Sequence, residues 1–414
     1  MYIKGPNVIS GEIFISGSKN SALSIIFGTI LTKKTVKIEN IPNILDVKIA
    51  LKILVILGAK IYFKKSLYID TSCIKKNLVC HPYVKMIRAS IYILGTLISR
   101  FENISLFLPG GCNLGYRPID MHIKILRNFG ASVNIVKDTI FVKRKKKIVG
   151  NILNFKKVSV GATINAIYIA TLADGKTIIN NPAKDPEILD TINFLNRIGA
   201  KIKIVNKNSK IVIKGVKTLK GCSNYKIIPD RIETATFLIA AAISKGKIKC
   251  YNTRPKLLSA FISKIKLSGA EINTGKTWVS LDMNKSYPKA VNINTGPYPE
   301  FPTDIQPQFT IMSVISKGTS VLTENIFKNR FSHIKWLINM GANIKILNNK
   351  IICKGVKEIF GKNVIANDLR CAASLMLAGC IAKGLTNIKN FSYLYRGYQN
   401  ICENLISLGV KLYF

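Results

Sequence analysis

A five-residue phrase recurs six times along the chain, and this repetition constrains the fold more than any other feature. The copies read LGAKI, FGASV, IGAKI, SGAEI, MGANI and LGVKL. A period of about 70 residues indicates repeated supersecondary units, and six such units account for the whole length of 414 residues. The glycines of the copies are 68 to 72 residues apart, at positions 58, 130, 199, 269, 341 and 409.

A helix is predicted before each copy, as the segment DPEILDTINFLNRIGAKIKIV illustrates. Asp185 can cap the helix, and Pro186 suits its first position. Ile188, Ile192 and Leu195 then form one apolar stripe at helical spacing. The phrase itself closes the helix.

A strand is predicted after each copy. Gly199 suits a left-handed cap, and Ile202 and Ile204 then alternate with lysines, as in a half-buried strand. A second junction, such as GKTIIN (175–180), follows another apolar helical run and leads into another strand. Each unit therefore contains two helices and several strands. This predicts an α/β architecture with three units to a domain, and a six-unit solenoid is the alternative.

The net charge of +41 raises the question of a nucleic-acid partner. The lysines are dispersed, however, and the one dense run, KRKKK (143–147), is short and contains no aromatic residue. Lys, Ile and Asn are frequent throughout, which is typical of an AT-rich genome. We therefore predict no nucleic-acid partner, and note that small anionic substrates would suit a basic protein.

Cysteine, histidine and apolar patterns exclude several other classes. The nine cysteines are scattered without a CxxC motif, and the three histidines lack metal-ligand spacing. This predicts free thiols in a reducing compartment and no metal site. The N-terminus lacks a signal-peptide core, and apolar runs such as AASLMLAGCIA (372–382) are shorter than a bilayer span. We predict a soluble, cytoplasmic protein with no membrane partner.

The segment LPGGCNLGYRPID (108–120) is the clearest sign of chemistry. Glycines flank Cys112, and Arg117 follows five residues later. Glycines permit loop closure, and a nearby arginine favours the reactive thiolate. Only 11 of the 62 basic residues are arginines, and the other 51 are lysines. If composition bias replaces arginine by lysine, the positions that keep arginine are expected to include those whose planar fork binds phosphate or carboxylate.

Nine segments together resemble the UDP-N-acetylglucosamine 1-carboxyvinyltransferases, a family of enolpyruvyl transferases. One segment alone would be weak support, but nine in this order are specific and cover essentially the whole chain. They are SGSKNSAL (16–23), MIRASIY (86–92), LPGGCNLGYRPIDMH (108–122), KVSVGAT (157–163), PDRIET (229–234), FPTDIQPQF (301–309), ENIFKNRF (324–331), NDLRCAASL (367–375) and YRGY (395–398).

The resemblance implies an α/β fold of two inverted α/β barrel (α/β prism) domains, each made of three pseudo-symmetric repeats of about 70 residues. The first domain would span residues 19–228 and carry the Cys112 loop. The second would combine residues 1–18 with 229–414, because the N-terminal strand crosses into it. The active site would lie in the cleft between the domains.

The resemblance also implies a reaction. The enolpyruvyl group of phosphoenolpyruvate would be transferred to the 3′-hydroxyl of UDP-N-acetylglucosamine through a tetrahedral ketal, with release of phosphate. This is the first committed step of peptidoglycan synthesis. The family uses no metal or organic cofactor. The oligomeric state stays open, and a monomer is compatible with the sequence.

Four residues would carry the chemistry by this resemblance. Lys19 and Arg396 would reach phosphoenolpyruvate. Asp304 is the candidate base, although a carboxylate among cations is expected to have a depressed pKa and to act partly by positioning the hydroxyl. Cys112 would be the general acid and can also add phosphoenolpyruvate covalently. The other eight cysteines are expected to be small buried apolar residues.

A larger set would bind the substrates by resemblance. Taken alone, Arg231 could instead form a surface ion pair, and His122 could be a structural histidine. The set comprises Lys19, Asn20, Arg88, Arg117, Pro118, Ile119, Asp120, Met121, His122, Lys157, Val158, Ser159, Val160, Gly161, Arg231, Asp304, Ile326, Arg330, Asp368 and Arg370.

The chain departs from the family pattern at three positions. Lys328 stands where the family carries glutamate, Tyr395 where an acidic residue is common, and Tyr92 where tryptophan is frequent. Three alternatives are considered. The sister enzyme, 5-enolpyruvylshikimate-3-phosphate synthase, lacks the cysteine loop. A basic nucleic-acid-binding repeat protein would need no converging motifs. An inactive protein could retain the fold for a binding role.

Overall fold

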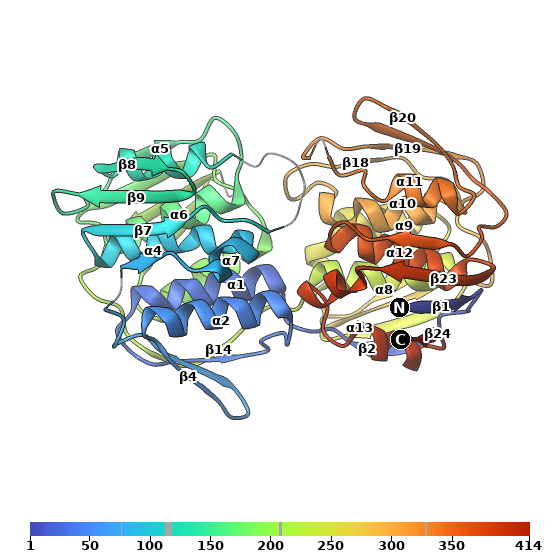
Figure 1. Cartoon of the computed structure of the whole chain (residues 1–414), viewed down its shortest axis with the longest axis horizontal. Helices are drawn as coiled ribbons and strands as arrows, with labels where there is room; N and C mark the ends of the chain where they lie inside the picture. Colours follow the sequence, from blue (N-terminus) through green and yellow to red (C-terminus); the bar gives the residue numbers. More distant parts are fainter. Residues whose placement is uncertain (76, 112–117, 207–208, 328) are drawn as a thin grey trace. The chain divides into compact units, whose positions relative to one another are not determined.

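The computed structural model describes residues 1–75, 77–111, 118–206, 209–327 and 329–414. These residues divide into two compact units, drawn in Figure 1. The C-terminal unit consists of Met1–Ser16 and Pro229–Phe414, and the N-terminal unit consists of the described residues from 17 to 228. The chain therefore passes between the units twice, after Ser16 and after Ile228.

One repeat of the N-terminal unit shows the strand-pairing pattern of all six sheets, three of which take a strand from another part of the chain (β14, β2 and β1). Its first two strands pair in parallel through a connecting helix, and its last two strands form an antiparallel hairpin in the same sheet. A parallel pair needs such a crossover. In chain order the elements are β10 (Ile152–Asn154), α6 (Val160–Thr171), β11 (Lys176–Asn180), α7 (Pro186–Arg197), β12 (Lys201–Val205) and β13 (Lys210–Lys214).

Six four-stranded sheets of this kind occur in the described residues, three in each unit, which confirms the six predicted repeats. The N-terminal unit also contains β14 (Cys222–Lys226), β3 (Val36–Glu39), β5 (Leu67–Asp70) and β4 (Lys60–Phe63) in one sheet, and β6 (Leu78–Val79), β7 (Asn103–Phe107), β9 (Thr139–Arg144) and β8 (Ala131–Val136) in another. The C-terminal unit contains β2 (Gly11–Phe14), β15 (Lys247–Tyr251), β17 (Trp278–Asp282) and β16 (Glu271–Thr274); β18 (Ile293–Asn294), β19 (Thr319–Thr323), β21 (Lys350–Lys354) and β20 (Asn343–Leu347); and β22 (Asn363–Ile365), β23 (Gly384–Lys389), β1 (Tyr2–Gly5) and β24 (Lys411–Tyr413).

The N-terminal residues complete two sheets of the C-terminal unit. β2 pairs in parallel with β15, and β1 lies between β23 and β24, antiparallel to both. The two chain ends are therefore neighbours in one sheet, as Figure 1 shows.

The recurring glycines end helices as predicted. All six adopt a positive φ, between 84° and 106°, which an L-residue with a side chain rarely tolerates. The predicted helix and apolar stripe are also confirmed, because α7 starts at Pro186 and buries Ile188, Ile192 and Leu195. The predicted cap differs. Asp185 precedes the helix, but its side chain makes no capping hydrogen bond.

The first helix of each repeat lies inside its unit. In the C-terminal unit α8 (Arg231–Ile243), α10 (Gln306–Val314) and α12 (Leu369–Ile381) pack against one another, and every residue of α8 and α10 is buried. Figure 1 shows these three helices in the interior of that unit. A helix without an exposed face is expected to be mainly apolar or small all round, and most residues of these helices are. The buried polar exceptions are Arg231, Glu233, Gln306, Gln308 and Arg370.

The remaining helices complete the repeats. Those of the N-terminal unit are α1 (Lys19–Gly28), α2 (Leu45–Leu57), α3 (Pro82–Met86), α4 (Tyr92–Arg100) and α5 (Asp120–Asn128), with 3-10 turns η1 (Thr29–Leu31) and η2 (Arg88–Ile91). Those of the C-terminal unit are α9 (Ser259–Leu267), α11 (Ile334–Asn339) and α13 (Ile401–Ser407), with η3 (Pro255–Leu258), η4 (Thr303–Ile305) and η5 (Phe391–Arg396).

The cysteines only partly follow expectation. Six of the eight described cysteines are buried, but Cys73 and Cys80 are exposed, so the expectation of burial is wrong for these two. Both lie in the irregular stretch between β5 and α3, outside the packed face of any helix. In the described part of the chain no group of His, Cys, Asp or Glu could hold a metal ion, and no helix is long and apolar enough to span a bilayer.

The position of β1 inside a sheet predicts a stability effect. Ile3 is fully buried, whereas Lys4 is exposed. Ile3→Ala is therefore expected to lower the free energy of unfolding by about 2–5 kcal/mol, and Lys4→Ala by less than about 0.5 kcal/mol. Urea unfolding followed by tryptophan fluorescence measures this, because both tryptophans, Trp278 and Trp336, belong to the C-terminal unit. Equal effects of the two substitutions would contradict this placement of β1.

Candidate active site

Asp304 is the centre of a charged cluster in the C-terminal unit. It lies in η4, directly before α10. Its Oδ1 accepts a hydrogen bond from Nη2 of Arg330 at 2.5 Å, and its Oδ2 accepts one from Nη2 of Arg370 at 2.8 Å. The side chains of Arg330 and Arg370 are 3% and 9% exposed, whereas that of Asp304 is 28% exposed. The carboxylate is thus the accessible member of the cluster.

The two arginines determine the ionisation of Asp304. Burial alone would raise the pKa of this carboxyl group, but the charges and hydrogen bonds of Arg370 and Arg330 outweigh burial and hold the pKa well below its usual range. Asp304 is therefore ionised near neutral pH, as expected from the sequence. Such a carboxylate is a weak base and a strong hydrogen-bond acceptor.

Arg330 is held by a second set of hydrogen bonds, through Thr303 and Glu324. Its Nε donates to Oγ1 of Thr303 at 3.2 Å, and that hydroxyl donates to the carboxylate of Glu324. Glu324 is buried and also accepts hydrogen bonds from the backbone N–H groups of Ile326 and Phe327. Glu324 therefore connects the 326–327 segment to Asp304.

Glu324 and Thr303 belong to this charged cluster but were not among the residues predicted from the sequence. Both stand in segments quoted above, ENIFKNRF and FPTDIQPQF, so the signal was present. The pairing between them joins positions 21 residues apart, which no local pattern reveals.

Arg370 is fixed by the start of α12. Asp368 caps this helix, because its Oδ1 accepts from the backbone N–H groups of Arg370 and Cys371. Its Oδ2 accepts from the hydroxyl of Ser332 at 2.8 Å. Asp368 was predicted to bind substrate, but here it is buried and all these bonds are internal. Its contact with substrate stays a prediction.

Two further arginines of the predicted set are buried in the same unit. Arg231 begins α8 and lies 5.6 Å from the centre of the Tyr298 ring, a cation–π contact. Because it is buried, the alternative of a surface ion pair is wrong. Arg396 ends η5 and is also buried. Ile326 is partly exposed.

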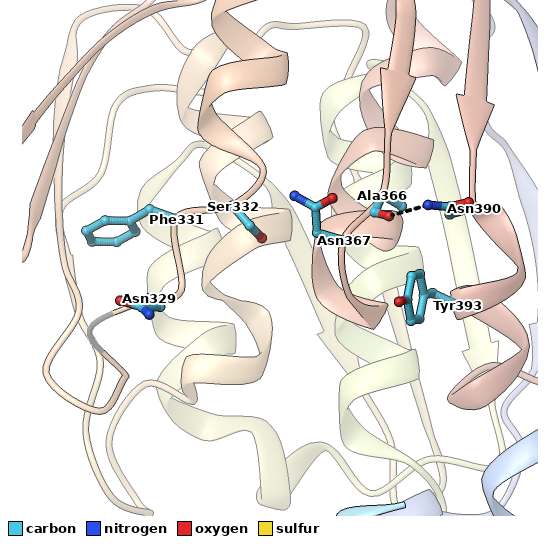
Figure 2. Close-up of a pocket in the computed structure, with 7 residues that line it drawn as sticks. All are labelled: Asn329, Phe331, Ser332, Ala366, Asn367, Asn390 and Tyr393. Carbon is cyan, nitrogen blue, oxygen red and sulfur yellow. Dashed lines mark hydrogen bonds between the residues drawn. The ribbon is translucent and has the colours of Figure 1, made fainter. Parts of the chain in front are cut away.

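A pocket of about 710 Å³ lies beside this cluster. Several of the residues that line it are also neighbours of cluster residues in the sequence. Asn329 and Phe331 flank Arg330, and Asn367 precedes Asp368. Figure 2 shows side-chain amides, hydroxyls and aromatic rings around the pocket, where Asn390 donates to the carbonyl of Ala366. The described lining is uncharged: Asn329, Phe331, Ser332, Ala366, Asn367, Asn390 and Tyr393.

In the N-terminal unit Lys19 begins α1 and forms an ion pair with Asp46 in the first turn of α2. Its Nζ lies 2.8 Å from Oδ2 of Asp46, and the side chains are 12% and 5% exposed. The neighbouring Asn20 is exposed. This partner fixes the position of the Lys19 ammonium group.

A second group of predicted residues meets around His122. Asn165 donates to Nδ1 of the His122 ring at 2.7 Å, and a side chain at position 161 would come within 3.1 Å of that ring. Burial, together with the nearby Arg88 charge, lowers the pKa of His122 to about 3, so the ring is neutral. Arg88 donates to the carbonyls of Pro109 and Pro118, at 3.5 and 3.4 Å.

The other predicted residues of this unit lie at helix starts. Ser159 caps α6 by accepting from the N–H of Ala162, and Asp120 is the exposed first residue of α5. Cys112, Arg117 and Lys328 lie outside the described residues. The partly or fully exposed members are Pro118, Ile119, Asp120, Met121, Lys157, Val158, Ser159, Val160 and Gly161.

Comparison with known sequences gives full-length matches. The family model of EPSP synthase (3-phosphoshikimate 1-carboxyvinyltransferase) matches residues 3–405. The UDP-N-acetylglucosamine 1-carboxyvinyltransferase of Buchnera aphidicola subsp. Schizaphis graminum is 52% identical over 413 residues, covering 100% of this chain and 99% of the relative. The protein of the same name from Cronobacter sakazakii is 47% identical, covering 99% and 97%.

Comparison with solved structures supports the fold. The enolpyruvyl transferase NikO from Streptomyces tendae superposes with a TM-score of 0.90 at 21% identity, covering 99% of this chain and 97% of the other. EPSP synthase from Acinetobacter baumannii gives 0.74 at 18% identity, covering 99% of both. The two-domain inverted α/β fold is thereby confirmed. The chain belongs to the enolpyruvyl transferases, and within them to the UDP-N-acetylglucosamine 1-carboxyvinyltransferase family.

Proposed function

We propose that this protein transfers the enolpyruvyl group of phosphoenolpyruvate to the 3′-hydroxyl of UDP-N-acetylglucosamine and releases phosphate, a step of peptidoglycan synthesis. The observation that carries the proposal is Asp304, held between two buried arginines with its carboxylate accessible. The names and full-length identity of the relatives support this choice of substrates.

The three directly bonded side chains suit an anionic substrate. Two guanidinium groups bond to the one carboxylate of Asp304, so this trio by itself carries one net positive charge. Phosphoenolpyruvate supplies a carboxylate and a phosphate, both of which match planar arginine forks. Arg330 and Arg370 are proposed to bind the carboxylate, and Lys19, Arg117 and Arg396 the phosphate.

Asp304 is proposed to hold the 3′-hydroxyl of the sugar. Its low pKa makes it a poor base in the resting state, so it orients the hydroxyl through a hydrogen bond. As the oxygen bonds to C2 of phosphoenolpyruvate, the hydroxyl proton passes to Asp304 and a second proton adds to C3. Loss of a C3 proton with departure of phosphate then gives the enol ether.

The remaining residues are assigned by resemblance. Cys112 is proposed as the acid that delivers a proton during addition. Arg88, the 118–122 segment, the 157–161 segment and Arg231 are proposed to bind the nucleotide sugar. The segments are at helix starts, where backbone N–H groups are available for a diphosphate or a nucleobase.

Phosphate release from purified protein tests the reaction and the role of Asp304. Release should require both phosphoenolpyruvate and UDP-N-acetylglucosamine, and shikimate 3-phosphate should not replace the nucleotide sugar. Asp304→Asn should lower kcat at least about 100-fold, because it removes the charged acceptor. The matched control is Asp282→Asn on β17, whose partner is the exposed Lys247. Release with shikimate 3-phosphate would contradict the proposed substrate.

The role of Cys112 predicts a separate effect. Cys112→Ala should lower kcat about 100-fold or more, as expected for loss of a general acid, with the unfolding midpoint unchanged. Cys80→Ala, at an exposed cysteine of the N-terminal unit, should leave kcat as in the parent protein. Full activity of the Cys112 variant would leave the proposed transferase activity intact. It would show that Cys112 is not the general acid.

Lys19 should affect binding of phosphoenolpyruvate. Lys19→Met removes a charge-assisted contact worth about 1.5–3 kcal/mol, so the KM for phosphoenolpyruvate should rise at least about tenfold. Lys37→Met breaks a more exposed ion pair, with Glu39, elsewhere in the N-terminal unit and serves as the control. If both variants bind phosphoenolpyruvate equally well, Lys19 is not a ligand of this substrate.

A further inference from the structure

Tyr398 is a buried tyrosine that the proposed mechanism does not use. Its side chain is 1% exposed, and its hydroxyl oxygen meets polar groups from three helices. Nε2 of Gln308 on α10 is 3.2 Å away, Oγ1 of Thr236 on α8 is 3.0 Å away, and Nη1 of Arg370 on α12 is 3.3 Å away. The first helices of all three repeats of the C-terminal unit therefore meet at this hydroxyl.

Donor and acceptor capacities fix the direction of these bonds. Thr236 donates its one hydroxyl hydrogen to the carbonyl of Ile232 at 2.9 Å, so toward Tyr398 it is an acceptor. Tyr398 then donates to Thr236, and its oxygen accepts from Gln308 and Arg370. Burial raises the pKa of Tyr398 above its ordinary value, so the phenol keeps the proton that it donates.

Arg370 is consequently held at both ends of its fork. Nη2 donates to Asp304 at 2.8 Å, and Nη1 donates to Tyr398. A guanidinium group is planar, so hydrogen bonds at both Nη1 and Nη2 oppose its rotation about the Nε–Cζ bond. Two other charged groups lie near Arg370 and Asp304. Asp230 faces Arg370, and Arg330 faces Asp304.

We propose that Tyr398 is a positioning residue, which locks the Arg370 guanidinium in the plane that pairs with Asp304 and with the anionic substrate. Its effect on the reaction rests on the proposed function, whereas its effect on Arg370 does not. Thr236 and Gln308 orient the phenol, and the phenol orients Arg370. The three helices thereby determine the direction of a charge in the candidate active site.

Rotation of the Arg370 guanidinium about its Nε–Cζ bond tests the proposal directly. Nuclear magnetic resonance of protein labelled with ¹³C and ¹⁵N at arginine resolves this rotation, and the chain has only 11 arginines. Arg370→Lys assigns the signal. Tyr398→Phe should accelerate rotation at least about tenfold, since a hydrogen bond to a charged group is lost. An unchanged rate in Tyr398→Phe overturns the proposal.

Tyr168→Phe is the matched control. Tyr168 is also fully buried, and its hydroxyl donates to the carbonyl of Ser24 in the N-terminal unit. This variant loses a buried hydrogen bond without touching Arg370, so the Arg370 rotation should stay as in the parent protein. Equal acceleration in both variants would indicate general loosening and would overturn the positioning role.

Steady-state kinetics separates this proposal from the proposed function. Tyr398→Phe should lower kcat about tenfold with both KM values changed less than about twofold, and Tyr168→Phe should change neither. Faster rotation with unchanged kcat would overturn the link to the reaction. If the parent protein releases no phosphate, the proposed function fails, while the rotation measurement still decides whether Tyr398 positions Arg370.

Discussion

The carboxylate of Asp304 between two buried arginines is the interaction on which the rest of the site depends. Burying two guanidinium groups is costly unless a counter-charge and hydrogen bonds compensate them. Asp304 provides that counter-charge, and Thr303 and Tyr398 provide additional oxygen atoms. Asp304 bonds to both arginines, so these three side chains together carry one positive charge, which an anionic substrate can complement.

The repeated architecture determines where these groups stand. Arg370 and Arg231 are in the first turns of α12 and α8, which Asp368 and Asp230 cap. Asp304 stands just before α10, the third helix of this inner group. Residues at or just before the starts of three equivalent helices thus supply several of the charged groups, while the rest of these helices is buried and mainly apolar. Charged residues of the candidate site therefore stand at helix starts, whereas the buried helix interiors contribute to the stability of the unit.

Local patterns predicted the local structure well. The glycine spacing revealed the repeats, because each glycine needs a left-handed conformation at a helix end. The placement of β1 and β2 in the C-terminal unit came from family resemblance, since pairing between β1 and β24 joins opposite ends of the chain. Asp304 was predicted as a site residue, but its pairing with Arg330 and Arg370 joins positions 26 and 66 residues apart. Periodicity carries no information about such pairs, which explains why Glu324 and Tyr398 were missed.

The central claim is that the carbon skeleton of phosphoenolpyruvate is transferred to the nucleotide sugar. The most direct measurement follows [2-¹³C]phosphoenolpyruvate by nuclear magnetic resonance in the presence of the protein and UDP-N-acetylglucosamine. The labelled carbon is expected to become the enol ether carbon of a sugar-linked product as phosphate appears. Label that stays in phosphoenolpyruvate, or that appears as free pyruvate, would contradict it.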